Sequence, residues 1–205
     1  MHIAIAGNIG AGKTTLAGLL ADHYGWEMLP EAADTNPYLK DFYEDMPRWA
    51  FQVQIYFLTS RFRQVLQVSR YPHDVVQDRT VYEDAYIFAR NLHASGRMAD
   101  RDYQTYLQLF ESVMELVRPP DLLIYLRADL PKLMDQIRRR GRAYEKNISP
   151  DYIAALNEHY RQWTESYDKG PLLVIDVNDL DYVRRPADFA SIVQQVDEKL
   201  FSARP

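Results

Sequence analysis

A short glycine-rich segment near the amino terminus has the residue types and spacing of a loop that binds phosphate groups. Residues 7–14, GNIGAGKT, match the pattern G-x-x-x-x-G-K-[ST] and lie between a short apolar run and a helical pattern. In such a loop, backbone N–H groups surround the phosphate oxygens, the lysine reaches the β- and γ-phosphates, and the hydroxyl group binds Mg²⁺. A glycine turn that merely starts a helix would not need all four fixed residues. We expect a nucleotide to bind at Gly7, Asn8, Ile9, Gly10, Ala11, Gly12, Lys13, Thr14 and Thr15.

Three charged residues follow two further predicted strands. Glu31 comes directly after an apolar run at residues 26–30, and Asp78 and Arg79 come after another at residues 74–77. Because ligands in an open α/β sheet bind beyond the carboxyl ends of the strands, these side chains should face the same cleft as the phosphate loop. There, Glu31 could accept the proton of an attacking hydroxyl group, Asp78 could hold Mg²⁺, and Arg79 could stabilise the transferring phosphoryl group. A single charged residue is usually a surface or capping group, but three at successive strand ends indicate catalysis.

An arginine-rich run, RRRGR at residues 138–142, ends a predicted helix. Cations are favourable at the C-terminus of a helix, so a solvated basic helix end is the simpler interpretation. The chain carries a net charge of −5, however, and a concentrated arginine patch in an acidic protein favours another role. We expect an Arg-rich lid at roughly residues 138–147, which closes over phosphate groups and excludes water.

A further group of side chains could recognise a nucleobase. Gln54 and Arg61 lie on one stripe of a predicted helix, and Asp84 and Phe88 lie four residues apart at the start of the next. A glutamine offers a donor and an acceptor in one plane, which suits the edge of a base, and a phenylalanine ring could stack on it. The same spacing fits a core phenylalanine and a glutamine that satisfies buried backbone groups. The spacing leaves both interpretations open.

Short apolar runs and longer helical segments alternate along the chain and must position these groups. Ser149 and Pro150 are typical of a helix start, and Asp129 could cap the helix that begins at residue 130. The alternation predicts an α/β fold of the P-loop NTPase type, a doubly wound, five-stranded parallel sheet with helices on both faces. Strands are predicted at residues 2–6, 26–30, 74–77, 122–126 and 172–177, and helices at residues 13–24, 47–70, 82–93, 102–117, 130–139, 150–167 and 186–201.

The composition limits the class of protein. The 205 residues, 47% of them hydrophobic, suffice for one domain spanning residues 1–205. The net charge of −5 argues against a broad basic surface for nucleic acid, and the absence of cysteine excludes disulfides and thiolate metal sites. The amino terminus lacks the pattern of a secretory signal, and no apolar stretch approaches the length of a membrane span. We expect a cytoplasmic protein with no nucleic-acid or membrane partner.

Six segments together resemble the deoxynucleoside kinase family over nearly the whole chain. They are GNIGAGKTT, WEMLPEAADTNPYLKDFY, WAFQVQIYFLTSRFR, QDRTVYEDAYIFARNL, RRRGRAYEKNISPDYI and LLVIDVNDLDYV. The stretches EAADTNPYLKDFY and DRTVYED are most similar to the bacterial deoxyadenosine/deoxyguanosine kinases. Two departures are Thr80, where the family usually has serine, and Ala32, where many members have proline. The threonine keeps the hydroxyl group, whereas the alanine changes the stiffness of the backbone after Glu31.

The resemblance implies a role for each matching residue. Glu31 would be the base for the 5′-hydroxyl group with Arg79 as its electrostatic partner, and Asp78 would be the acid near Mg²⁺, together with Thr14. The implied catalytic set is Glu31, Arg79, Lys13 and the lid arginines Arg140 and Arg142, which would also bind ATP. The implied substrate-binding set begins with Glu31 and Arg79. Gln54 would bind the nucleobase with Phe88 stacked against it, and Arg61 and Asp84 would complete this pocket. Tyr43 and Glu145 would bind the 3′-hydroxyl group. A homodimer is typical of the family.

The predicted reaction transfers the γ-phosphate of ATP to the 5′-hydroxyl group of a deoxynucleoside, with Mg²⁺ as cofactor. Deoxyadenosine, then deoxyguanosine, would be preferred, because the pair Arg61 and Asp84 resembles the purine-accepting members. A deoxycytidine-preferring or broadly specific member is the alternative. A thymidylate-type nucleoside monophosphate kinase would need cations where Glu31 and Tyr43 stand. A nucleotide-dependent switch would lack a pocket for a base, and the N-K-x-D motif of guanine-specific switches does not occur.

Overall fold

Five parallel strands form the centre of the protein, in the order β2-β3-β1-β4-β5. The computed structural model describes residues 1–205 except 32, 34, 69–72, 146–147 and 202–205. All five predicted strands are confirmed, with ends that differ from the predicted ends by a residue or so. The strands are β1 (His2–Gly7), β2 (Glu27–Leu29), β3 (Val75–Asp78), β4 (Leu122–Arg127) and β5 (Leu172–Asp176).

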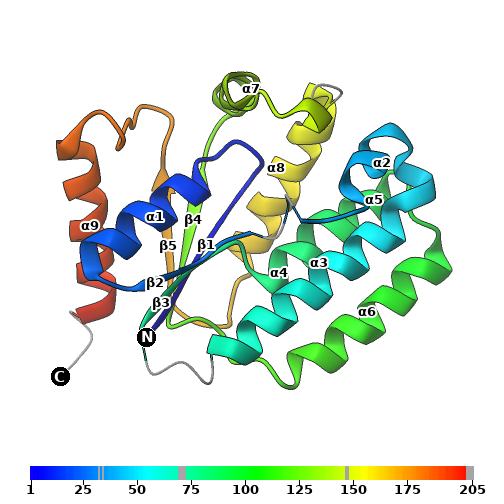
Figure 1. Ribbon diagram of the computed structural model, residues 1–205, viewed down its shortest axis with the longest axis horizontal. Coiled ribbons are helices and arrows are strands. Elements are labelled where there is room, and N and C mark those ends of the chain that lie inside the picture. Colours follow the sequence, from blue (N-terminus) through cyan, green and yellow to red (C-terminus); the bar gives the residue numbers. More distant parts are fainter. Residues whose placement is uncertain (32, 34, 69–72, 146–147, 202–205) are drawn as a thin grey trace.

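Helices lie on both sides of this sheet, which confirms the doubly wound α/β fold (Figure 1). On one side are α1 (Lys13–Tyr24) and α9 (Pro186–Phe201), and on the other are α3 (Met46–Val68), α6 (Asp100–Met114) and α8 (Pro150–Glu165). The shorter elements are α2 (Leu39–Glu44), α4 (Val81–Glu83), the π-helix η1 (Asp84–Ala89), α5 (Arg90–Ala94), α7 (Leu130–Arg140) and the 3₁₀ helix η2 (Ala143–Glu145).

The predicted helix over residues 82–93 is regular only at its two ends. Helical backbone runs from Val81 to Ala94, but the middle segment, Asp84–Ala89, is π-helical. A π-turn closes with an i→i+5 hydrogen bond, and such turns are frequent at functional sites. Hydrophobic periodicity does not reveal the change, because a short π-segment contains the same residue types as an ordinary helix.

Two other helix predictions need correction. The short helix α2 was not predicted, because its six residues, Leu39–Glu44, show too little periodicity. Asp129 occupies the N-cap position of α7, but its side chain makes no capping hydrogen bond. Its backbone N–H instead donates to Asn178 Oδ1 at 2.9 Å, so the turn after β4 is held by the segment that follows β5. Ser149 does cap α8, accepting from the Tyr152 N–H. The predicted helix end at residue 70 lies outside the described residues.

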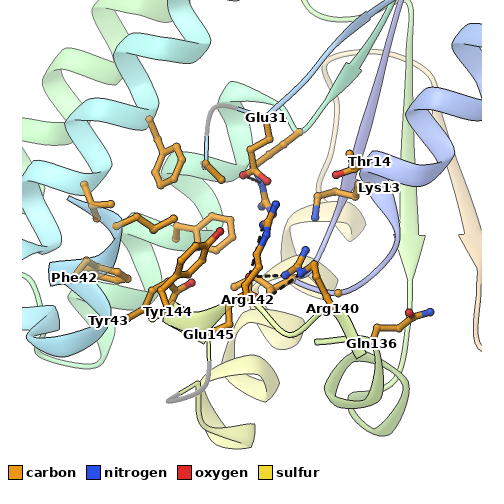
Figure 2. A pocket seen from close by; sticks show the side chains of 18 of the residues that line it. Lys13, Thr14, Glu31, Phe42, Tyr43, Gln136, Arg140, Arg142, Tyr144 and Glu145 are labelled. Carbon is orange, nitrogen blue, oxygen red and sulfur yellow. Dashed lines mark hydrogen bonds and ion pairs between the residues drawn. The ribbon is translucent and has the colours of Figure 1, made fainter. Parts of the chain in front are cut away.

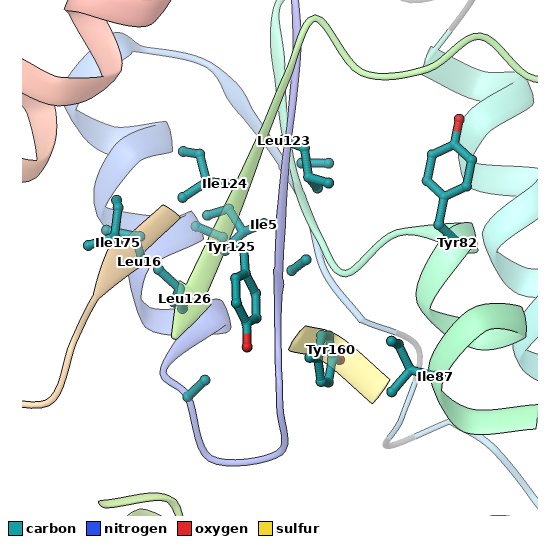
Figure 3. Packing of buried hydrophobic residues seen from close by; sticks show 14 of the residues in the cluster. Ile5, Leu16, Tyr82, Ile87, Leu123, Ile124, Tyr125, Leu126, Tyr160 and Ile175 are labelled. Carbon is teal, nitrogen blue, oxygen red and sulfur yellow. The ribbon is translucent and has the colours of Figure 1, made fainter. Parts of the chain in front are cut away.

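The hydrophobic core packs against the sheet and helps to fix the register of its strands. Ile5 and Leu123 are fully buried, and the ring of Tyr125 stacks on that of Tyr160 from α8 at 5.6 Å between centroids (Figure 3). Removing a side chain from such a core costs about 2–5 kcal/mol. Ile5 pairs with Asp78 on one side and with a residue of β4 on the other. The segments that follow β1, β3 and β4 therefore meet at one edge of the sheet.

Candidate active site

The phosphate loop connects β1 to α1 at this edge. Gly10 has a φ of 86°, and a Cβ atom there would lie 2.8 Å from the backbone oxygen of Leu133, so the position requires glycine. Lys13 is buried, and its Nζ donates to the carbonyl oxygen of Asn8 at 3.0 Å. Burial, aided by the nearby charge of Arg79, lowers the pKa of Lys13 to about 8. The lysine therefore remains largely cationic at neutral pH and lies beside the N-terminus of α1, where anions bind.

Thr14 and Asp78 form the pair that could hold a divalent cation. The Thr14 hydroxyl group donates to Asp78 Oδ2 at 2.5 Å, whereas Asp78 Oδ1 is buried and has no hydrogen-bond partner among the described residues. Burial raises the pKa of Asp78. The described residues contain no group of three histidine, cysteine or acidic side chains that could hold a metal. This pair fits Mg²⁺, which usually keeps several waters and takes its remaining ligands from one or two carboxylates and the substrate phosphates.

Glu31 lies between two guanidinium groups after β2. Its Oε1 is 2.7 Å from Arg79 Nε and 3.2 Å from Arg61 Nη2. Burial would raise the pKa of Glu31, but the charges of Arg79 and then Arg61 outweigh it and lower the pKa to about 2. The carboxylate is therefore ionised at neutral pH and able to accept a proton or a hydrogen bond from a hydroxyl group.

Arg79 adopts a backbone conformation that is rare for a side chain with a Cβ atom. Its φ is 73°, the one positive value outside glycine in the described part of the chain, and it costs about 1–2 kcal/mol. Its Nη1 donates to Tyr160 Oη at 3.0 Å and to Glu83 Oε1 at 3.3 Å. The guanidinium carbon lies 4.6 Å from the centroid of the Phe88 ring. Strain of this kind concentrates at functional sites, where surrounding contacts hold it.

The helix α3 and the π-helix η1 supply the residues predicted to bind the base. Gln54 and Asp84 line a cavity, and Gln54 Oε1 and Asp84 Oδ2 are buried without a hydrogen-bond partner among the described residues. Arg61 does not line this cavity. It donates to the Asp78 carbonyl oxygen at 3.0 Å and lies 3.7 Å from Asp84 Oδ2, besides its contact with Glu31. Arg61 therefore connects three acidic residues from behind the cavity wall.

The segment after α7 closes the other side of the cavity. Arg140 Nη2 donates to Glu145 Oε1 at 2.5 Å, and Arg142 Nη1 lies 3.8 Å from the same oxygen. Tyr43 from α2 stacks on Tyr144 with ring centroids 5.8 Å apart. Burial, and then nearby groups that include Glu145, raise the pKa of Tyr43, so its hydroxyl group stays protonated. Residues 146 and 147 of the predicted lid, and Ala32 after Glu31, lie outside the described residues.

One cavity of about 500 Å³ brings these groups together. Lys13, Thr14 and Glu31 lie toward one end and Phe42 and Tyr43 toward the other (Figure 2). Of the predicted site residues, Arg61 and Asp78 stand outside the lining, and so do Gly7, Asn8 and Ala11 of the loop. Sequence reasoning did not select several residues that also line the cavity, because most are apolar or aromatic and resemble core residues. They are Ala33, Leu39, Phe42, Val53, Phe57, Gln136 and Tyr152, whereas Arg139 and Tyr144, which also line it, fall within the predicted lid.

A phosphate loop at the switch between β1 and β3, with a carboxylate and an arginine at neighbouring strand ends, defines a phosphotransferase of the P-loop class. Residues 3–202 match the model of the Deoxynucleoside kinase family, and the chain belongs to this family. It is therefore an ATP-dependent kinase of deoxynucleosides.

Similar proteins cover almost the whole chain. The deoxyadenosine/deoxycytidine kinase of Bacillus subtilis is 39% identical over 95% of this chain and 90% of its own length. A deoxyguanosine kinase of the same organism is 32% identical over 96% of each chain. The structure of deoxyadenosine kinase from M. mycoides with bound dATP superposes with a TM-score of 0.85, at 31% identity, over 96% of this chain and 99% of the other. In the part of the chain that the structure describes, no helix is long and apolar enough to cross a membrane.

Proposed function

We propose that this kinase prefers purine deoxynucleosides, deoxyadenosine ahead of deoxyguanosine, with MgATP as the phosphate donor. The observation that carries the base preference is the pair of buried acceptors, Gln54 Oε1 and Asp84 Oδ2, on the cavity wall. The exocyclic amine of adenine can donate to such acceptors, and the Gln54 amide can donate to a neighbouring ring nitrogen. Thymine carries a carbonyl oxygen where adenine has its amine, with a methyl group beside it, so Asp84 Oδ2 would find no hydrogen-bond donor there.

Deoxycytidine is the second candidate acceptor. Cytosine also carries an exocyclic amine beside a ring nitrogen, so it presents the same donor and acceptor pattern to Gln54 as adenine does. A relative of 39% identity named deoxyadenosine/deoxycytidine kinase supports this candidate, and relatives named deoxyguanosine kinase support the second purine. Guanine presents a carbonyl oxygen and a ring N–H at this edge, so both polarities are reversed, which Gln54 could meet by turning its amide.

We propose that Glu31 accepts the proton of the 5′-hydroxyl group as the hydroxyl oxygen bonds to the γ-phosphorus of ATP and the bond to the ADP oxygen breaks. The ionised state of Glu31 and its contact with Arg79 support this role. Lys13, Arg140 and Arg142 would neutralise the charge on the phosphoryl oxygens. Mg²⁺, held by Thr14 and Asp78 directly or through water, would supply further charge neutralisation at the β- and γ-phosphates.

Tyr43 and Glu145 would recognise the 3′-hydroxyl group of the sugar. The protonated phenol can donate and the carboxylate can accept, so together they match a hydroxyl group. Glu145 also contacts Arg140 at 2.5 Å, which would link binding of the sugar to the position of the lid. By resemblance to the family we further propose a cytoplasmic homodimer. Sedimentation analysis that finds only monomers at assay concentrations would contradict the dimer.

The deciding experiment is a panel of the four deoxynucleosides with MgATP, with kcat/KM measured for each by separation of the nucleotides. We expect deoxyadenosine to have the highest value and thymidine the lowest. Thymidine as the best substrate would refute the roles of Gln54 and Asp84. Deoxycytidine as the best substrate would keep those roles and overturn the purine ranking.

A further inference from the structure

Two fully buried polar residues, Glu83 and Tyr160, lie behind the active site and take no part in the chemistry proposed above. Glu83 is the last residue of α4, directly before the π-helix, and Tyr160 lies in the second half of α8. Both are 0% exposed, and neither lines the cavity. An ionisable carboxyl group is costly to bury, so its contacts should reveal what it stabilises.

The two oxygens of Glu83 have different partners. Oε2 accepts from the Thr80 N–H at 2.7 Å, and the Glu83 N–H donates to Thr80 Oγ1 at 3.4 Å; these two hydrogen bonds are the capping box of α4. Oε1 lies 2.6 Å from Tyr160 Oη, 3.2 Å from the Gly7 N–H and 3.3 Å from Arg79 Nη1. A helix cap needs only the first set of contacts. The second set joins the first residue of the phosphate loop to the strained arginine after β3.

Tyr160 repeats this connection from α8. Its hydroxyl group accepts from Arg79 Nη1 at 3.0 Å, and it lies 2.8 Å from the Gly7 carbonyl oxygen. The Gly7 N–H is thus bonded to Glu83 and the Gly7 carbonyl oxygen to Tyr160. Both of these side chains also bond Arg79. The Arg79 guanidinium group lies between two carboxylates, with Glu31 at Nε and Glu83 at Nη1.

We infer that Glu83 and Tyr160 are positioning residues for phosphoryl transfer, which hold Arg79 at a set place relative to the phosphate loop. The inference rests on the proposed role of Arg79 beside Glu31. The contacts of Glu83 and Tyr160 keep Arg79 in its left-handed backbone conformation and keep its Nε directed at Glu31, the proposed catalytic base. A small misplacement of such a group weakens transition-state stabilisation more than it weakens binding of either substrate.

The test compares kcat and KM for Glu83→Gln and Tyr160→Phe with those of a matched control, Tyr125→Phe. Glu83→Gln keeps an acceptor oxygen for the helix cap but removes the charge that Arg79 faces. Tyr125 stacks on Tyr160, and its hydroxyl group has no hydrogen-bond partner among the described residues, so the control removes a hydroxyl group from the same ring stack. We expect kcat to fall about 10-fold or more in both test variants, with each KM within about 3-fold, and little change in the control.

The double variant Glu83→Gln/Arg79→Lys separates this inference from the proposed role of Arg79. If Glu83 acts through Arg79, its substitution should reduce kcat much less in the Arg79→Lys background than in the wild type. Equal reductions in both backgrounds, or full kcat in Glu83→Gln and Tyr160→Phe, would overturn the inference. Wild-type kcat in Arg79→Lys alone would instead overturn the role of Arg79. If Glu83→Gln does not fold, Tyr160→Phe alone and combined with Arg79→Lys decides by the same criteria.

Discussion

The two ends of the cavity differ in how completely their polar groups are bonded. At the phosphate end, Lys13, Thr14 and Arg79 all have hydrogen-bond partners within the protein, and Arg79 Nε also forms an ion pair with Glu31. Asp78 Oδ1, where a cation is proposed to bind, has no hydrogen-bond partner among the described residues. At the base end, buried acceptors of Gln54 and Asp84 have none among the described residues. The difference separates two tasks. Phosphoryl transfer requires charged groups that are already held in place, whereas recognition of the nucleobase requires groups whose hydrogen bonds only the correct ligand can complete.

The largest effect should come from Glu31, the proposed catalytic base at the phosphate end of the cavity. Glu31→Gln keeps the size of the side chain and an acceptor for Arg79 but removes the proton acceptor. Turnover should fall about 10²- to 10⁴-fold while ATP still binds. Steady-state kinetics with deoxyadenosine, together with equilibrium binding of ATP, checks this. Turnover within a few-fold of the wild type would remove Glu31 from the chemistry.

Arg140 and Arg142, the proposed lid arginines, should give the next largest effect. Arg140→Ala and Arg142→Ala should each lower kcat about 10²- to 10³-fold, with less change in KM for the deoxynucleoside, because the charge that they stabilise develops during transfer. Arg138→Ala is a useful control, since Arg138 is exposed, does not line the cavity and donates to the Met134 carbonyl oxygen on its own helix. If Arg140→Ala and Arg142→Ala both retained full kcat, the arginine run at residues 138–142 would be only a solvated helix end.

Removal of the 3′-hydroxyl group from the substrate should have a smaller effect, because it leaves hydrogen bonds unmade but keeps Glu31, the proposed catalytic base, in place. The value of kcat/KM for 2′,3′-dideoxyadenosine should be about 10- to 10²-fold below that for deoxyadenosine. In Tyr43→Phe this ratio should shrink, since the phenolic hydroxyl group that is proposed to bind the 3′-hydroxyl group is absent. Equal efficiency on both nucleosides in the wild type would contradict the assignment of Tyr43 and Glu145.

The smallest expected effect is a pH-dependent choice between the purines. Burial raises the pKa of Asp84 to about 7. Below that pH the carboxyl group can donate to the carbonyl oxygen of guanine, and above it the carboxylate can accept from the amine of adenine. The ratio of kcat/KM for deoxyadenosine to that for deoxyguanosine should therefore rise a few-fold between about pH 6 and pH 8. In Asp84→Asn the ratio should not vary with pH.

Asp84 should also affect stability in the same pH range. Because its pKa is raised by folding, the folded protein holds a proton that the unfolded chain has lost between the ordinary value of 3.8 and about 7. This group therefore lowers the free energy of unfolding as the pH rises through that window. Comparison of denaturant unfolding of the wild type and Asp84→Asn at several pH values would reveal the difference. An identical pH dependence for both proteins would show that Asp84 is not the titrating group.

The sequence predicted the phosphate end better than the base end. A loop such as residues 7–14 is contiguous, so its residue types and spacing describe the site directly. Glu31 and Arg79 could be placed because strand ends in a parallel sheet meet at one edge. At the base end, α2 is too short for periodicity to reveal, and the apolar lining residues look like core residues. Neither the π-helix at Asp84–Ala89 nor the position of Arg61 behind the cavity wall has a sequence pattern of its own.

The sequence by itself therefore determined the class of fold, the phosphate loop and the charged residues at the strand ends, because each depends on local pattern. Only the tertiary structure decided which of these groups touch. Glu83 and Gly7 are 76 residues apart, and Tyr160 and Gly7 are 153 apart, yet both pairs are hydrogen bonded. Contacts of this range depend on how α4 and α8 pack against the sheet. That packing is set by the whole core, and no single segment of the sequence encodes it.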